Sequence, residues 1–491
     1  MMMKLFKQLT ILCFLVALTS CAREATVFER VKQDEVKLLS FGFYEADNPG
    51  MIVKDYVVND IKSKDVIIAL PEEVDKTGLI ARFTLSNQNV ARVGAVIQKS
   101  GETVNDFSIP VDYVLSVGNN NSRYTIRIDK APAFIWKPVP FTYNDSAVGI
   151  KMKISPATKE PYIMYYESRP SSSDQGVSMI AFQNGVWNSL GRISDGRSTS
   201  FIDFTFNNAG IPYASYVDYT AAVAQAATVK KYDNGTAWSL VGAKGVTTTK
   251  ITYNTLTFNT DSKLLMVTMM DAANVLARRE AGVSIFENNA WSTDNKVTGR
   301  ASSLFSWFLT TVTKNGVTYL GIVDAAAPGS FSLYKFENNA WSKLVEQWRD
   351  PKATQMHTSG DFDMDVDNEG NVYAALADNS STAAFQHRVV KYDAATKTVS
   401  SIGSSIAGAS GGSFSFDLAL SPLGTPYLFY RSSTNYPTLV YLDKDTHDWS
   451  TPYVFETDAA AELNLDFTSD GEAYVAYLKG RKLFVHKYTA P

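Results

Sequence analysis

A turn followed by a strand centred on an aromatic residue recurs along most of this chain. The clearest copy runs DNEGNVYAALAD, from Asp367 to Asp378. Seven copies follow one another at intervals of 47 to 54 residues, and their central residues are Tyr162, Tyr213, Met266, Tyr319, Tyr373, Tyr427 and Tyr474. Self-similarity at a fixed period of about fifty residues is typical of a propeller or solenoid array. The sequence therefore predicts a repeat architecture before any single element is assigned.

Most repeats also contain a second motif, in outline an aromatic residue, then Asn, then Trp. It reads FENNAW at both Trp291 and Trp341. A repeat therefore reads as four strands, the second centred on the tyrosine and the fourth beginning at the tryptophan. The last repeat stops before its fourth strand, but Trp136 stands 51 residues before Trp187, in phase with the outer strands. We expect a seven-bladed β-propeller over residues 133–491, its last blade closed by the strand around Trp136.

Two repeats lack the glycine that the other five have in the turn before the tyrosine strand. Lys159 and Lys263 stand in its place. Glycine suits a turn residue with positive φ, so we expect these two blades to use a different loop.

The region before the repeats has a different pattern. Residues 38–130 contain short alternating runs such as DVIIALP and RYTIRI, separated by turn signals such as NPG and GNNN. Six or seven short strands in such a span indicate an Ig-like β-sandwich. The segment SGETVNDFSIPVDY followed by YTIRI resembles the Ig-like modules that precede other domains in lipoproteins of the Bacteroides group. The expected fold class is thus all-β, an Ig-like β-sandwich followed by a seven-bladed β-propeller.

The first twenty residues have the pattern of a secretory signal peptide. Lys4 and Lys7 precede the apolar run Leu9–Leu18, which is too short to span a bilayer as a permanent helix. The run ends in Leu-Thr-Ser-Cys, which resembles a bacterial lipobox. The resemblance implies cleavage before Cys21 and lipidation of its thiol, whereas an ordinary signal peptide with a chance cysteine is the alternative. The only other cysteine is Cys13, so the mature chain would carry no disulfide.

These features predict the cellular location of the protein. Residues 21–37 are mostly polar and suit a tether, and lipid chains would anchor the protein to a membrane without spanning it. Residue 22 is Ala, which by analogy with lipoprotein sorting favours the outer membrane; whether the protein faces the cell surface or the periplasm stays open. The formal net charge of −4 over 491 residues gives no reason to expect nucleic acid as a partner.

The copy from Val366 to Asp393 resembles the NHL-type propeller repeat, and the FENNAW segments resemble those of kelch-like propellers. Both resemblances imply the fold and leave the activity open. Five residues past the reference position an acid stands in five repeats, and these candidate ligand-binding residues are Glu167, Asp218, Asp271, Asp324 and Asp378. Such a rim of carboxylates could attract a cation or a hydroxyl-rich ligand. The alternative is that each acid accepts backbone N–H groups in its own turn, as the Asp of NHL-type repeats does.

A second group of acids falls on the innermost strands. The run Asp361–Asp367 alternates with period two, which places its acids on one strand face, and Asp203 and Asp417 are equivalent to Asp363. We expect these acids to be solvated in a water-filled channel. The spacing does not fit a calcium loop, so no metal site and no cofactor are predicted.

The longest connection between repeats, residues 345–360, offers Trp348, Arg349 and His357 together. Long loops on a rigid scaffold are where function concentrates. Nearby loops add further candidates for ligand contact, namely Trp307, Arg278, Arg279, Arg431 and Tyr436. Aromatic rings with charged neighbours suit stacking on sugars or gripping a protein, but Trp307 and Trp348 could equally pack between blades.

No residues form a recognisable catalytic constellation, so no catalytic residue is assigned. We therefore expect a membrane-anchored, exported binding protein whose propeller presents a face to an extracellular ligand, such as a glycan or glycoconjugate. One alternative is a carbohydrate-active enzyme, a polysaccharide lyase or glycoside hydrolase built from dispersed acids, arginines and His357. The other is an envelope module that binds a surface protein.

Overall fold

The structure is a computed structural model of the 491-residue chain. It describes residues 36–86, 90–131, 135–140, 146–199, 201–233, 235–259, 261–271, 276–301, 303–324, 329–350, 362–378, 386–408 and 415–489. Within these ranges the chain is nearly all β-strand, and the only helices are two three-residue 3-10 turns. No helix among the described residues is long and apolar enough to cross a membrane. The expected all-β class is confirmed.

The chain divides into two compact units. The first takes up residues up to 49 together with 55–70 and 75–130, and the second takes up 50–54, 71–74 and the chain from 131 onward.

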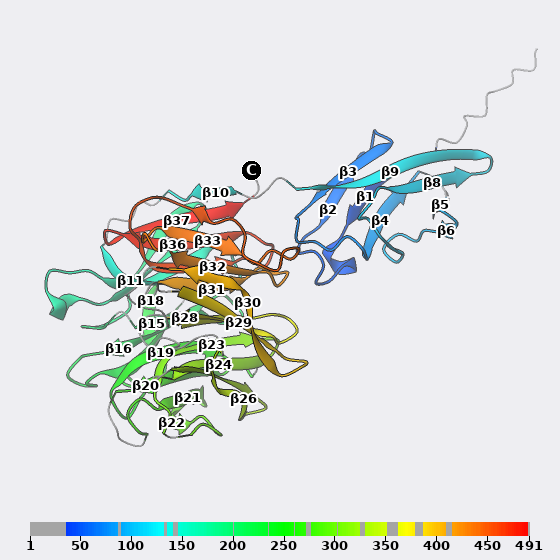
Figure 1. Cartoon of the computed structure of the whole chain (residues 1–491). Coiled ribbons are helices and arrows are strands. Elements are labelled where there is room, and N and C mark those ends of the chain that lie inside the picture. Colours follow the sequence, from blue (N-terminus) through cyan, green and yellow to red (C-terminus); the bar gives the residue numbers. More distant parts are fainter. Residues whose placement is uncertain are drawn as a thin grey trace, which may run out of the picture. The chain divides into compact units, whose positions relative to one another are not determined.

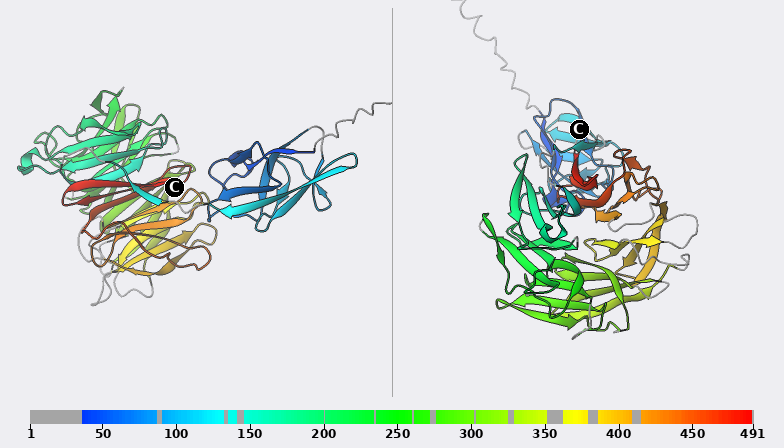
Figure 2. Two further views of the ribbon diagram at one scale, coloured as in Figure 1. Left: turned by 90° about the horizontal axis from the view of Figure 1, so that it is seen from above. Right: turned by 90° about the vertical axis from the view of Figure 1, so that its left-hand side faces the viewer.

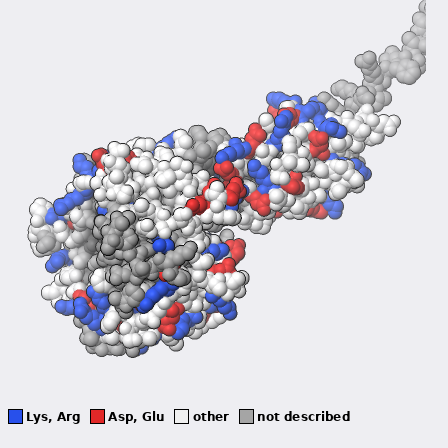
Figure 3. Space-filling view, viewed as in Figure 1, with Lys and Arg blue, Asp and Glu red and all other residues white. Residues whose placement is uncertain are grey.

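In the view of Figure 3, acidic and basic side chains are interspersed over the described surface of the second unit, and no large single-sign field covers this face.

The first unit consists of two sheets. One has the strand order β2-β1-β4-β7 and the other the order β3-β9-β8-β5-β6. Their bounds are β1 (Leu38–Phe43), β2 (Tyr56–Asn59), β3 (Asp65–Leu70), β4 (Leu79–Leu85), β5 (Val90–Val93), β6 (Val96–Ile97), β7 (Val104–Asn105), β8 (Val111–Val117) and β9 (Asn120–Lys130). Phe41 of the first sheet meets Tyr113 of the second edge to face, with 5.1 Å between ring centroids, and both are fully buried. Large rings that contact across the two sheets thus form this unit's core.

The second unit contains seven four-stranded antiparallel sheets in its described part. The first four are β11 (Ala147–Ile154), β12 (Pro161–Glu167), β13 (Val177–Gln183), β14 (Val186–Arg192); β15 (Ile202–Phe206), β16 (Pro212–Asp218), β17 (Ala226–Asp233), β18 (Ala237–Leu240); β19 (Ile251–Phe258), β20 (Leu264–Met270), β21 (Ala281–Glu287), β22 (Ala290–Lys296); and β23 (Ser306–Lys314), β24 (Val317–Asp324), β25 (Ser330–Glu337), β26 (Ala340–Trp348).

The remaining three sheets follow in the same way. They are β27 (Phe362–Val366), β28 (Val372–Asp378), β29 (Gln386–Asp393), β30 (Thr398–Ala407); β31 (Phe416–Leu420), β32 (Pro426–Arg431), β33 (Pro437–Tyr441), β34 (Tyr453–Val454); and β35 (Ala461–Phe467), β36 (Ala473–Lys479), β37 (Lys482–Thr489) with β10 (Ile135–Pro138). In the last sheet, β10 comes from the start of the unit and pairs with β37, so that Trp136 lies opposite Tyr488.

The seven sheets form a ring. The first strand of each sheet contacts the first strand of the next, and β35 contacts β11, so the cycle of innermost strands closes. Figure 1 labels the strands, and the right-hand view of Figure 2 shows the sheets arranged around a common centre. A closed ring of four-stranded antiparallel sheets is the arrangement of a β-propeller.

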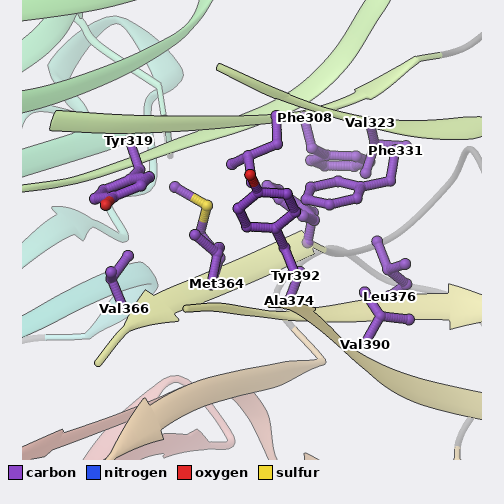
Figure 4. Packing of buried hydrophobic residues seen from close by; sticks show 13 residues of the cluster. Phe308, Tyr319, Val323, Phe331, Met364, Val366, Ala374, Leu376, Val390 and Tyr392 are labelled. Carbon is purple, nitrogen blue, oxygen red and sulfur yellow. The ribbon is translucent and has the colours of Figure 1, made fainter. Parts of the chain in front are cut away.

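Apolar side chains from adjacent sheets interdigitate to hold the ring together. Figure 4 shows one such cluster, in which Tyr319 and Phe331 of β23–β26 face Met364 and Tyr392 of β27–β30. Equivalent clusters lie between other neighbouring sheets. Burying one Phe, Leu or Met side chain contributes roughly 1.5–3 kcal/mol, so the repeated apolar positions of the second and third strands account for the stacking of the sheets.

The expectation of a different loop holds at one of the two lysine turns and is wrong at the other. The Lys159 N–H donates to the Ser155 carbonyl four residues back at 2.8 Å, whereas the Gly210 N–H donates to Asn207 three residues back at 2.9 Å, so the Lys159 loop is longer. In the other repeat the Ser262 N–H donates to the Asn259 carbonyl at 3.0 Å, which is the turn of the glycine repeats shifted one residue earlier. Lys159 and Ser262 both take the left-handed conformation, with φ of 57°, at some conformational cost.

Candidate functional site

The innermost strands enclose a central channel, a cavity of about 310 Å³ lined by residues from all seven of them. Its polar lining includes acids, lysines, threonines and asparagines, namely Lys151, Lys153, Asp203, Asn254, Thr255, Thr257, Thr310, Thr311, Thr313, Asp363, Asp365, Asp417, Asn464 and Asp466. The alternation of the inner strands points every second side chain toward this space. This channel is one of two regions in which the fold brings polar side chains of the described residues together.

The channel acids are not freely solvated, and that expectation is wrong. Each accepts a backbone N–H from the neighbouring innermost strand, so that carboxylates connect one sheet to the next. The pairs are Leu256 N–H to Asp203 (2.8 Å), Leu418 to Asp363 (3.0 Å), Leu420 to Asp365 (2.8 Å), Leu465 to Asp417 (2.6 Å) and Ile154 to Asp466 (2.7 Å). Innermost strands in a propeller are not hydrogen-bonded to one another as a sheet, and these side chains supply acceptors for their free N–H groups.

Enclosure also changes the acidity of these groups. It raises the pKa of Asp365 to about 7 and that of Asp466 to about 6, against the opposing effect of the N–H groups that each carboxylate accepts. Burial and then the nearby Asp363 carboxylate raise the pKa of Asp417. Asp203 is instead held by the Lys153 ammonium, with 2.8 Å between Oδ1 and Nζ. Part of the channel therefore holds carboxyl groups that keep a proton near neutral pH.

The second region is the end of the ring where the second strands finish. Antiparallel pairing brings the start of each first strand and the start of each third strand to the same end. Three of the proposed rim acids are fully buried there and accept a hydroxyl from the third strand of their own sheet. These hydrogen bonds are Ser178 to Glu167 (2.6 Å), Thr228 to Asp218 (3.1 Å) and Ser332 to Asp324 (2.6 Å).

The same acids have further partners within the ring. Asp218 accepts the Thr220 N–H at 2.9 Å in its own turn. Asp324 accepts the Arg300 guanidinium at 2.5 Å, and both side chains are inaccessible, at 0% and 2% exposure. Asp271 is one-third exposed and accepts the Gln225 side-chain amide at 3.1 Å. The Asp378 side chain lies outside the described residues. Ligand binding by these acids stays a prediction, but the geometry of the three buried ones is that of turn and strand capping.

Two arginines at this end of the ring stack on aromatic rings. The Arg279 guanidinium lies over Trp307, with 4.0 Å between its carbon and the ring centroid, and the Arg197 guanidinium lies over Tyr219 at 4.9 Å. We call these four residues the arginine–aromatic row. Among the described residues, neither guanidinium lies within ion-pair distance of a carboxylate. A stacked guanidinium is stabilised by the ring quadrupole and keeps its in-plane N–H donors for another group.

The row extends over three consecutive sheets. Arg197 precedes β15, Tyr219 follows β16, Arg279 precedes β21, and Trp307 lies near the start of β23. Asp271 connects the two pairs, because its charge acts on the pKa of both Tyr219 and Arg279, although burial is the larger influence on each. Arg278 is exposed and lies 3.9 Å from Asp271. Asp271 is thus partly exposed beside these arginines, whereas the adjacent acids Asp218 and Glu280 are buried and lie near Lys244 and Lys296.

The backbone at Arg279, within the arginine–aromatic row, is strained. Arg279 has φ of 64°, in the left-handed region that bulky residues rarely adopt. Its N–H donates to the Met270 carbonyl at 2.7 Å, and its carbonyl accepts the Ser306 N–H at 2.8 Å. The backbone is therefore fixed from two sides, and the strained conformation aims the side chain at Trp307.

The other predicted loop residues are placed as follows. Trp348 ends β26, lies opposite Phe331, and packs, partly buried, on the cluster between β23–β26 and β27–β30; Trp307 contacts the same cluster. Arg349 follows it and is exposed. His357 and the lipidation candidate Cys21 lie outside the described residues. The fold thus joins Trp307 and Trp348 through one apolar cluster.

Arg431 and Tyr436 belong to a different part of the ring. They flank the tight turn between β32 and β33, where the Ser432 N–H donates to the Tyr436 carbonyl at 3.0 Å. The sheet β27–β30 separates this turn from β23–β26. Between the sheets β27–β30 and β31–β34, where the His387 ring contacts Phe416, burial lowers the pKa of His387 to about 3, so this imidazole is neutral. The structure does not bring Arg431 and Tyr436 into the arginine–aromatic row.

The sequence interpretation missed Arg197 and Tyr219. Tyr219 stands directly after the rim acid Asp218, and Arg197 precedes the innermost strand of the same sheet. That position beside a rim acid was the available signal. No group of three or more His, Cys, Asp or Glu side chains suited to a metal ion is found in the part of the chain that the structure describes.

The chain matches no protein-family model and no curated protein. Several solved structures are similar to it. The BP39L lectin from Burkholderia pseudomallei shares 12% identity, with 70% of this chain and 98% of the lectin covered and a TM-score of 0.48. The polysaccharide lyase Uly1 shares 10% identity over 72% and 92% of the two chains, with a TM-score of 0.47. An ulvan lyase bound to -[GlcA(1-4)Rha3S]- shares 13% over 72% and 96%, also with 0.47. At these values the similarities carry no argument about the activity or ligand of this chain.

Proposed function

We propose that this chain is an exported, lipid-anchored binding protein whose seven-bladed β-propeller presents one end of its ring to a glycan or glycoconjugate. In this proposal the Ig-like sandwich is a spacer and Cys21 is the lipidated residue. The observation that carries it is the arginine–aromatic row, in which rings and guanidinium groups from three consecutive sheets gather at one end of the ring. The anchor and the location at the outer membrane rest on the sequence pattern.

The chemistry of the row suits sugars. A pyranose presents apolar C–H faces and a rim of hydroxyl groups, so it is recognised by aromatic faces beside planar hydrogen-bond donors. Tyr166, half-buried like Tyr219, extends the aromatic surface of the row; burial raises the pKa of both phenols, and the Arg197 charge opposes this. These side chains are positioned on strand ends and fixed connections, which limits the entropy lost on binding.

A carbohydrate panel tests this function. The full-length protein is heated with neutral and acidic oligosaccharides and polysaccharides, and its unfolding temperature is recorded together with chromatography of the sugars. A sugar that raises the unfolding temperature and is recovered unchanged supports a binding protein, since only ligands of the folded state stabilise it. If no glycan shifts the transition while a surface protein does, the envelope interaction module replaces this proposal.

A second candidate function is the carbohydrate-active enzyme. The observation in its favour is the raised pKa of Asp365, about 7, in a cavity of about 310 Å³, because a general acid works best with a pKa near the operating pH. New products in the same chromatography, lost in Asp365→Asn, would establish it. Turnover that survives this substitution would remove the channel from the mechanism.

A further inference from the structure

Two of the described arginines of the ring differ from its ion-paired arginines. Arg300 and Arg388 are partly or fully enclosed and lie 2.5 Å and 3.2 Å from Asp324 and Asp350. Arg197 and Arg279 lie over aromatic rings instead of beside carboxylates. An arginine without an internal carboxylate keeps its planar fork of N–H donors for a carboxylate or another oxyanion.

The two pairs place a guanidinium on a ring at the same end of neighbouring sheets, from different connections. Arg197 comes from the connection between β14 and β15, and its ring follows β16; Arg279 comes from the connection between β20 and β21, and its ring lies at the start of β23. Stacking uses the flat face of the guanidinium, so the N–H groups along its edge stay available for a planar or tetrahedral oxyanion. Two stacked guanidinium groups on consecutive sheets fit a ligand with several anionic groups better than they fit a single small ion.

Burial increases the attraction of Arg279 for an anion. Arg279 is half-buried, and burial and the neighbouring Arg278 charge both lower its pKa. A cation in that position gains from an incoming anion, because partial removal of water makes the Coulomb attraction larger than at an exposed site. Asp271, whose charge acts on both pairs, already accepts the Gln225 amide and lies 3.9 Å from Arg278.

We propose that the arginine–aromatic row binds an acidic glycan, with carboxylate or sulfate groups held by Arg197 and Arg279 and sugar faces against the adjoining rings. This inference rests on the proposed glycan-binding function and names its substrate class. Uronic acid carboxylates and sulfate esters present the same oxyanion chemistry to a guanidinium, so the shared feature is a regular anionic group on a sugar chain.

Three polymers separate the sources of the anion. Polygalacturonate supplies carboxylates, dextran sulfate supplies sulfates, and dextran supplies neither. The full-length protein is titrated with each by calorimetry at about 0.15 M salt, where contacts between exposed charges beyond roughly 8 Å are screened. We expect binding of at least one of the two anionic polymers and no binding of dextran, and the polymer preferred identifies the anion.

Substitutions at the row localise the binding. Arg279→Asn removes the guanidinium and keeps a residue that tolerates positive φ, and we expect it to weaken binding about tenfold or more. Arg279→Lys keeps the charge without the planar fork and should recover only part of that loss. Arg123→Ala is the matched control, because it removes one exposed arginine of the first unit, which lies 3.4 Å from Asp112, and it should leave affinity unchanged.

The outcomes are distinct. Anionic binding that is unchanged in Arg279→Asn, or weakened equally in Arg123→Ala, overturns this inference and leaves glycan binding in place. Binding of neutral glycans alone does the same. Failure of every glycan in the panel overturns the proposed function as well. Unchanged thermal unfolding of Arg279→Asn and Arg279→Lys shows that the losses come from recognition and not from the fold.

Discussion

The central channel and the arginine–aromatic row both concentrate charge, but they treat it in opposite ways. In the channel, each lining acid accepts a backbone N–H from the next strand, as Asp203 does from Leu256 at 2.8 Å. In the row, Arg279 lies 4.0 Å over an indole ring and pairs with no described carboxylate. A charge whose partners lie within the fold contributes to architecture, and a charge left without one is available to a ligand. Burial and pairing, rather than the number of charged residues, distinguish the two regions.

The largest expected effect is on stability and concerns the rim acid Asp324, whose charge, like those of the channel acids, is paired within the fold. Asp324→Ala leaves the inaccessible Arg300 guanidinium without its carboxylate, and we expect a loss of about 3–5 kcal/mol in the free energy of unfolding. The measurement is the midpoint of urea unfolding. Asp271→Ala is the control, because that carboxylate is one-third exposed, and it should cost less than about 1 kcal/mol. An Asp324 variant as stable as the wild type would move this acid to the ligand-binding group.

The next effect tests the connection between innermost strands. Asp203→Ala removes the acceptor of the Leu256 N–H and the partner of the Lys153 ammonium, so we expect a loss of about 2–3 kcal/mol. Thr205→Ala, on the same strand, is the matched control and should cost well under that amount. If both variants unfold at the same urea concentration, the channel acids do not hold the ring together.

The pH dependence of stability follows from the raised pKa of Asp365, about 7, and of Asp466, about 6. A carboxyl whose folded pKa exceeds its unfolded value of about 4 favours the folded state most at low pH, and this contribution is lost as pH rises through 6 to 7. Both groups are enclosed by the channel but not fully inaccessible, so we expect a loss of about 1–2 kcal/mol between pH 5 and pH 8. Urea unfolding at several pH values measures it.

Asp365→Asn provides the control for this prediction. The amide cannot titrate, so the variant should lose its share of the pH dependence while the remainder, due to Asp466, persists. A wild type whose stability rises steadily from pH 5 to pH 8 would contradict the assignment of protonated carboxyls to the channel.

The smallest expected effect on stability lies in the row. Arg197→Ala removes an exposed side chain with no described carboxylate partner, so the free energy of unfolding, measured with urea, should change by less than about 0.5 kcal/mol. Arg192→Ala, five residues earlier, removes hydrogen bonds to the Asp174 and Ser194 carbonyls and should cost about 1 kcal/mol. A larger loss at Arg197 than at Arg192 would make the row a structural feature.

The sequence carried the architecture further than it carried the site. The tyrosine repeat anticipates the second strands, because period and alternation depend on local residues, and Trp136 stands in phase with the outer strands that β10 joins. The conformation of Lys159 and the burial of the channel acids were not predictable in this way. Both depend on where neighbouring sheets place their backbones, which no local pattern encodes.

The site illustrates the same limit. Trp307, Arg278 and Arg279 could be selected from the sequence because aromatic and basic residues stood near the ends of strands. The stacking of Arg197 on Tyr219 joins residues 22 positions apart, across the connection and two strands of one sheet. Sequence inspection also could not separate arginines with internal carboxylates from those without, since that distinction requires three-dimensional partners.

The pairing of β10 with β37 has a consequence for how the ring forms. This sheet joins the segment around Trp136 to the one around Tyr488, near the two ends of the second unit. During synthesis β10 emerges first and β37 last, so the ring cannot close until almost the whole chain has left the ribosome. Contacts this distant in sequence slow folding and expose unpaired strand edges in the meantime. The sheet that closes the ring is therefore also the last one whose strands are all available.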